Sequence, residues 1–169
     1  GGGRIPIFCD TTSCTHTLLF ETGGDILTPE NREKYKQLKI MDITQWLKEV
    51  VLPRIKVIRP KNRILLHPTC SCQIMGLTPV LLDIARKCAR EVILPDNWGC
   101  CGASGDRGFI FPELSDSATR DERDEIGHES FDGCYSLART CEIAMQDHIE
   151  QPYESIVYLV DETIQDQGT

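Results

Sequence analysis

The chain has 169 residues, of which 40% are hydrophobic, and its formal net charge is -8 at pH 7. This length and composition suit one globular domain with a substantial core. The negative charge argues against binding to nucleic acid, because the chain would repel phosphates. No stretch approaches the ~20 apolar residues of a membrane-spanning helix, so we expect no membrane span.

Residues 4–9 are predicted as a short strand, residues 10–14 as a loop and residues 15–20 as the start of a helix. A proline at the first turn favours a helix over residues 29–38. Asp42 can cap a further helix. Five residues of that helix share one face at helical spacing: Ile43, Trp46, Leu47, Val50 and Val51.

Strands and helices alternate in the rest of the chain. The predicted strands cover residues 63–67, 91–94 and 129–135. The predicted helices cover residues 78–89, 112–126, 137–149 and 153–164, and a glycine-rich loop covers residues 96–108. We interpret the acidic run Asp121, Glu122, Asp124 and Glu125 as a solvated helix face. The alternation predicts an α/β fold, a layered and largely parallel sheet with flanking helices.

Nine cysteines are many for a chain of this size, and the count is odd. We see no secretory leader, and we therefore expect a cytoplasmic location in which thiols stay reduced. Clustered cysteines in that setting indicate metal ligands or catalytic thiols rather than disulfides.

The cysteine groups follow the ends of the predicted strands. Cys70 follows the first strand of the alternating region, Cys100 and Cys101 follow the second, and Cys134 and Cys141 follow the third. Sites in parallel sheets form at the carboxyl ends of the strands. We therefore expect cysteine loops at these ends to converge on one site.

Cys100 and Cys101 are adjacent and are flanked by Gly99 and Gly102. Glycines can relax the backbone so that both thiolates reach one polynuclear cluster. Open backbone N–H groups in such a loop would also hydrogen-bond to cluster sulfur. The alternative is two small buried residues in a tight turn.

Other residues are candidates for supporting roles. Cys141 begins a predicted helix, whose N-terminus stabilises a thiolate. Cys70 and Cys72 form a Cys-Ser-Cys segment. Cys70 is the expected ligand, and Cys72 is a spare ligand or a packing residue. Cys134 is uncertain, and Cys88 is expected to be inert core.

Three polar residues could form an outer shell around the site. His67 could donate a hydrogen bond to it or relay protons, although a histidine at a strand end is often structural. Asp106 and Arg107 could form a charged lid, or an ion pair that stabilises the loop.

The cysteine spacing indicates a thiolate metal site but does not identify the metal. Four thiolates suit tetrahedral zinc, yet the paired Cys-x-x-Cys knuckles of common zinc modules are missing. The usual ferredoxin spacings are missing too. Thiol–disulfide exchange at Cys100 or Cys101 is a third alternative. No nucleotide-binding loop or serine elbow occurs, and we predict no catalytic residue in this chain.

At Cys70, Cys100-Cys101-Gly102 and Cys141 the sequence resembles the cysteine-rich CCG domain. That domain occurs in one of the subunits of heterodisulfide reductase, in the iron–sulfur subunit of glycolate oxidase and in the C-terminal region of FAD-linked D-lactate dehydrogenases, which the chain resembles most. The segments that carry the resemblance are His67-Pro-Thr-Cys-Ser, Gly99-Cys-Cys-Gly-Ala-Ser-Gly-Asp-Arg-Gly-Phe and Ala138-Arg-Thr-Cys-Glu-Ile.

The resemblance implies Cys70, Cys100, Cys101 and Cys141 as ligands of an iron–sulfur cluster, of the 4Fe–4S type. The family motif has one more cysteine, whose position falls on Ala138, and Cys134 is a candidate replacement. The segment Asp10-Thr-Thr-Ser-Cys-Thr resembles the tail of a preceding module, with Cys14 as its last ligand. The resemblance thus implies a module tail in 1–28, a helical linker in 29–62 and a CCG domain in 63–169.

The resemblance also implies a function. The chain is expected to be an electron-transfer fragment of a flavin-dependent D-lactate or 2-hydroxyacid dehydrogenase, with FAD bound in upstream sequence. Its partners would be that flavin-binding part and an electron acceptor, which is a quinone, a cytochrome or a protein. Peripheral membrane association is compatible with such a role. A zinc-binding structural module and a thiol–disulfide module are the alternatives.

Overall fold

A computed structural model describes residues 3–22 and 26–164 of the protein. The strands are β1 (Ile7–Cys9), β2 (Ile40–Asp42), β3 (Lys61–Leu66), β4 (Ala89–Ile93), β5 (Gly133–Ser136) and β6 (Tyr153–Ser155). The α-helices are α1 (Thr12–His16), α2 (Pro29–Tyr35), α3 (Ile43–Trp46), α4 (Cys70–Ile74), α5 (Thr78–Cys88), α6 (Arg107–Ile110), α7 (Pro112–Ile126), α8 (Arg139–Ile149) and α9 (Ile156–Thr163). A π-helical turn follows α1 (η1, Thr17–Glu21), and another follows α3 (η2, Leu47–Val51) before a 3₁₀ turn (η3, Leu52–Arg54).

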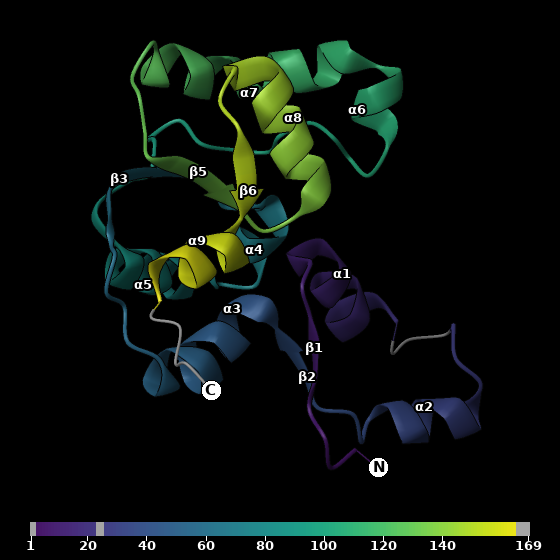
Figure 1. Ribbon diagram of the computed structural model, residues 1–169. Coiled ribbons are helices and arrows are strands. Elements are labelled where there is room, and N and C mark those ends of the chain that lie inside the picture. Colours follow the sequence, from purple (N-terminus) through teal and green to yellow (C-terminus); the bar gives the residue numbers. More distant parts are fainter. Residues whose placement is uncertain (1–2, 23–25, 165–169) are drawn as a thin grey trace.

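The main sheet has the strand order β4-β3-β5-β6, and its strands are all parallel. Helices α5 and α9 lie on one side of it and α7 and α8 on the other (Figure 1). Successive side chains of a strand point to opposite faces. Ile64 and Leu66 of β3 therefore join the core with α5 and α9, whereas Leu65 joins the core with α8. The predicted α/β fold with a layered parallel sheet is confirmed.

A second, smaller sheet consists of β1 and β2 alone, which pair in parallel. It lies with α1, α2 and α3 beside the main sheet (Figure 1). Phe8 of β1 stacks on Trp46 of α3, with ring centroids 4.6 Å apart. Phe8 nevertheless remains 47% exposed, so this sheet is only partly covered.

The start of α3 follows the predicted cap. The Asp42 carboxylate accepts a hydrogen bond from the backbone N–H of Thr44 at 2.9 Å, and the Gln45 side chain accepts one from the N–H of Asp42 at 3.1 Å. This reciprocal arrangement is a capping box. The predicted apolar face follows it, with Ile43 and Leu47 buried.

The secondary structure differs from the sequence prediction in several places, among them β5, which begins at Gly133 rather than at residue 129, and α6, which begins inside the loop expected over 96–108. Helix α1 begins at Thr12, inside the expected loop, and α4 begins at Cys70, where no helix was predicted. Strand β2 lies in the expected helical linker of residues 29–62 and pairs with β1. Residues 153–155 form β6 rather than the first turn of a helix, because β5 offers them a parallel partner.

Within residues 3–22 and 26–164, no helix combines the length and the apolarity that a membrane span requires.

Candidate functional site

A cavity of about 470 Å³ lies where α4 and α8 begin, at the carboxyl ends of β3 and β5. Its volume is many times the ~30 Å³ that a water molecule occupies in the liquid. Five cysteines line it: Cys14, Cys70, Cys100, Cys101 and Cys141. The four predicted ligands and one of the additional candidates thus come together at the expected edge of the sheet.

Cys70 is placed by the end of β3 and the start of α4. Thr69 caps this short helix, since its hydroxyl accepts a hydrogen bond from the N–H of Cys72 at 3.2 Å. Cys70 is then the first helical residue and lies exposed at the rim of the cavity. Backbone N–H groups of Cys70 and Ser71 hydrogen-bond to its thiol, which favours the thiolate.

Cys100 and Cys101 are placed by a loop that needs Gly102. Gly102 has a φ of +73°, and a Cβ there would lie 2.6 Å from the carbonyl oxygen of Leu114. Only glycine allows the loop to pass so close to the start of α7. The N–H of Gly102 donates to the sulfur of Cys100 at 3.4 Å. Gly99, the other predicted glycine, faces open space and lacks a positive φ.

Cys141 is the third residue of α8 and is buried. Its sulfur lies 3.0 Å from that of Cys101. The first turn of α8, where the helix dipole is positive, borders the cavity. Arg139, in the same first turn, also lines the cavity and donates to Glu142 at 3.0 Å. Arg139 was not predicted as a site residue, although a cation two residues before a cysteine that is a predicted ligand is a usable signal.

Cys14 is the third residue of α1, so it reaches the cavity from the side of the molecule that holds the small β1-β2 sheet. The backbone N–H of Thr12 donates to the carbonyl oxygen of Leu137 at 3.2 Å. This bond joins the start of α1 to the turn that precedes α8. Cys14 is exposed, so it lies at the rim rather than at the floor.

The four predicted ligands form one connected series of sulfur contacts. The Cys100 thiol shares hydrogen bonds with those of Cys70 and Cys101, and Cys101 in turn contacts Cys141. Burial and the neighbouring Cys100 raise the pKa of Cys70. The hydrogen bond with Cys101, together with burial, raises the pKa of Cys100.

The pKa of Cys101 is raised to about 12, because its contact with Cys141 and its burial outweigh the lowering effect of the hydrogen bond with Cys100. Without a bound cation, these three thiols therefore hold their protons near pH 7. A metal ion or cluster must displace those protons when it binds.

Thiols and backbone N–H groups are the donors that iron–sulfur clusters use, so the chemistry of the cavity fits such a group. Among the residues that the structure describes, no three His, Cys, Asp or Glu side chains are placed so that one metal ion could bind them all. The thiols instead lie around a wide cavity and touch in pairs.

Four other cysteines lie outside this cavity: Cys9, Cys72, Cys88 and Cys134. Cys72 is buried with its sulfur 3.9 Å from the Thr78 hydroxyl, and Cys88 is buried in the core as predicted. Cys134 is buried in β5, where burial raises its pKa to about 12. It does not line the cavity, whereas Ala138 does. The expectation that Cys134 could replace the thiol missing at Ala138 is therefore not met by its position.

His67 is buried behind the site and does not line the cavity. Its Nδ1 lies 2.9 Å from a carboxylate oxygen of Glu122, which is buried too. Glu122 belongs to the acidic run of α7, so the prediction that this run is a solvated face is wrong for that residue. The Nε2 atom of His67 is buried with no hydrogen-bond partner among the described residues.

The predicted lid is not formed by the residues proposed for it. Asp106 and Arg107 are exposed and do not line the cavity. The preceding residues Ser104 and Gly105 do line it, in a backbone turn with positive φ at both positions.

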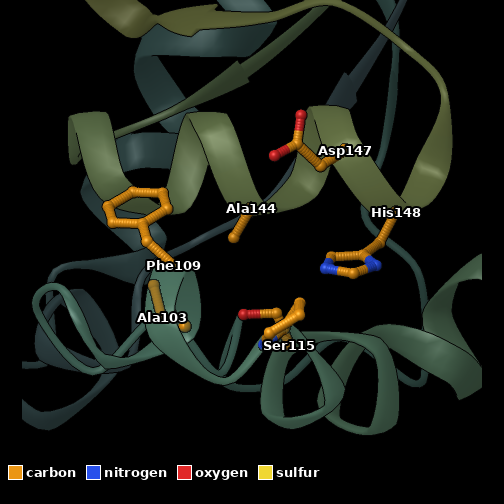
Figure 2. A pocket seen from close by; sticks show the side chains of 8 residues that line it. Ala103, Phe109, Ser115, Ala144, Asp147 and His148 are labelled. Carbon is orange, nitrogen blue, oxygen red and sulfur yellow. The ribbon is translucent and has the colours of Figure 1, made fainter.

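A second, smaller cavity of about 220 Å³ lies behind the cysteine loop, and Ala103 borders both cavities. Figure 2 shows the Ser115 hydroxyl and the His148 ring pointing into it, with Ala144 above and Phe109 at one side. The Ser115 oxygen is buried without a hydrogen-bond partner in the described part of the chain. No pattern in the sequence pointed to Ser115 or to His148.

A comparison of the sequence with models of known protein families gives no match, and a comparison with curated proteins gives none either. The resemblance to the CCG domain thus stays a prediction that rests on the residues quoted for it.

Proposed function

We propose that the protein is an electron-transfer domain that holds an iron–sulfur cluster on Cys70, Cys100, Cys101 and Cys141. One observation carries this proposal. The four sulfurs form a connected series at the edge of a single cavity, although they come from the ends of three different parallel strands. Such a gathering of thiols is the donor set that iron–sulfur clusters require.

The residues of the cavity have distinct tasks in this proposal. Cys101 and Cys141 are buried and keep water from the floor, whereas Cys70 and Cys100 are exposed and face an approaching partner. Backbone N–H groups of Ser71, Gly102 and Ala103 donate to sulfur and stabilise its negative charge. A bound iron–sulfur cluster would supply one-electron transfer.

The proposal extends to a parent enzyme through the sequence resemblance. The chain would be the C-terminal part of a flavin-dependent D-lactate or other 2-hydroxyacid dehydrogenase. The flavin part would oxidise the substrate, and this domain would pass electrons on to a quinone, a cytochrome or a protein. The chain itself would then contribute no catalytic residue.

The test is iron and sulfide analysis of protein purified and reconstituted without oxygen. We expect stoichiometric iron and sulfide with visible absorption in the intact chain. The Cys101→Ser variant should lose most of both, because Cys101 lies at the centre of the series. Cys9→Ser is the matched control, since Cys9 does not line the cavity. Colourless protein that binds zinc and takes up no iron and sulfide would contradict the proposal.

Thiol–disulfide exchange is a second candidate, favoured by the 3.0 Å distance between the sulfurs of Cys101 and Cys141. The Cys101 thiolate would attack a substrate disulfide and release one substrate thiol. Cys141 would then attack the mixed disulfide, releasing the second thiol and leaving a Cys101–Cys141 disulfide, so that two electrons pass to the substrate.

The raised pKa of Cys101, about 12, opposes this exchange because only a thiolate attacks. Reduction of a small disulfide by metal-free protein, lost in Cys101→Ser, would favour this candidate over the cluster.

A further inference from the structure

We propose that Cys14 supplies a fifth thiol ligand to an iron–sulfur cluster bound in the cavity. The cluster would then lie between the small β1-β2 sheet with its helices and the main sheet. This inference rests on the proposed function. Its starting point is that Cys14 lines the same cavity as Cys70, Cys100, Cys101 and Cys141. Ala138, where the cysteine pattern lacks a thiol, lines that cavity too.

The position of Cys14 reproduces that of Cys141. Cys14 follows the last residue of β1, Cys9, by five residues (14 − 9), and Cys141 follows the last residue of β5, Ser136, by five (141 − 136). Each is the third residue of the helix that begins after its strand. The same strand–turn–helix path thus places a cysteine beside the cavity in both cases.

The equivalence continues in the neighbouring strands. Cys9 pairs with Asp42 in the small sheet, and Ser136 pairs with Ser155 in the main sheet. Asp42 and Ser155 each end their strand, and each caps the helix that follows. We therefore define two units: the N-terminal unit, β1-α1-β2-α3, and the C-terminal unit, β5-α8-β6-α9.

Helix α1 is held against the cavity by contacts that do not involve Cys14. The Thr12 N–H bond to the Leu137 carbonyl fixes its first turn, and the side chains of Thr12 and Thr15 are completely buried. Helix α1 also lies beside α4, which carries Cys70 (Figure 1). The thiol of Cys14 is thus presented to the cavity by packing that exists before any ligand binds.

Reconstituted protein tests this inference through the release of iron to a chelator under anaerobic conditions. We expect Cys14→Ser to lose iron at least about tenfold faster than the intact chain, because even partners outside the first ligand shell contribute 10–100-fold to metal affinity. Cys9→Ser is the matched control. It lies in the same unit, and its thiol contacts the Thr11 carbonyl oxygen at 3.5 Å instead of the cavity.

A metal-free measurement accompanies the first. A bifunctional thiol reagent should link Cys14 to one of the four cavity cysteines, and peptide mapping would identify the pair. Iron release from Cys14→Ser at the rate of the intact chain would overturn the inference and leave the four-thiol proposal standing. Failure of the intact chain to take up iron and sulfide would instead overturn the proposed function, and the inference with it.

Discussion

The N-terminal and C-terminal units share one chain path but differ in what surrounds them. In the C-terminal unit β5 lies between β3 and β6, and its Tyr135 is 1% exposed. In the N-terminal unit β1 has β2 as its only partner among the described residues, and the equivalent residue, Phe8, is 47% exposed. A short local path, rather than deep burial, is therefore enough to bring a cysteine to the cavity.

The difference should also appear in stability. A residue that packs on several elements contributes more to the free energy of unfolding than its counterpart at an open edge. Equivalent positions of the two units can be compared directly, so that each variant has its control in the other unit.

The largest effect is expected at the paired aromatic residues. Tyr135→Ala should lower the free energy of unfolding by about 3–5 kcal/mol, because it opens a cavity in the main core. Phe8→Ala should lower it by only about 1 kcal/mol, since the ring is half exposed already. Denaturant unfolding of both variants measures this. Equal losses would show that the small sheet is as well supported as the main one.

For the helix caps, the loss of stability should be larger in the N-terminal unit than in the C-terminal unit, the reverse of the order expected for the aromatic residues. The Asp42 carboxylate accepts hydrogen bonds from the Thr44 N–H at 2.9 Å and from the Thr44 hydroxyl at 2.6 Å. The Ser155 hydroxyl accepts one at 3.4 Å. We expect Asp42→Ala to destabilise the protein by about 2 kcal/mol and Ser155→Ala by about 0.5 kcal/mol. A larger effect at Ser155 in thermal or chemical unfolding would contradict this.

The third comparison is between Cys134 and the equivalent Ile7. The pKa of Cys134 in the folded protein, about 12, lies above its ordinary value of 9.0 because the thiol is buried. The folded state therefore keeps its proton longer than the unfolded state, and this stability is present below the ordinary pKa and is lost as the pH rises toward 12.

In Cys134→Ala the decline in stability between about pH 9 and about pH 11 should be less steep by about 1.4 kcal/mol per pH unit. Ile7→Ala should leave the slope unchanged. Urea unfolding of metal-free protein across this range provides the measurement, and parallel slopes for Cys134→Ala and the intact chain would refute the expectation.

The smallest expected effect comes from moving the fifth thiol from one unit to the other. If Cys14 stands in for a thiol at Ala138, then Cys14→Ser combined with Ala138→Cys should retain iron about tenfold longer than Cys14→Ser alone. Iron release to a chelator measures this. Release as fast as in the single variant would mean that the two positions are not interchangeable.

Much of the fold could be predicted from the sequence, because the long helices that cover the main sheet have apolar residues at a clear helical period. Helix α7 covers Pro112–Ile126 as predicted, and α5 agrees within one residue at its end. The missed elements were short. Three-residue strands such as β2 and β6 carry no period of their own and are defined by their partner strands.

The convergence of Cys70, Cys100, Cys101 and Cys141 on one cavity could be predicted because strand ends converge in a parallel sheet. The nearness of Cys14 could not, since it depends on how α1 packs against the turn before α8. The burial of Glu122 was missed for a similar reason. Its partner, His67, lies 55 residues earlier in the chain, and a run of acidic residues gives no hint of which one turns inward.

The backbone bond from Thr12 to Leu137 has a thermodynamic consequence. It joins two segments that each carry a thiol, so the attachment of α1 and the filling of the cavity are linked equilibria. If contact with Cys14 strengthens the binding of a group in the cavity, that group in turn stabilises the attached state of α1 by the same free energy. Hydrogen exchange at the Thr12 amide should therefore slow on reconstitution by the same factor by which Cys14→Ser lowers the equilibrium affinity for the bound group.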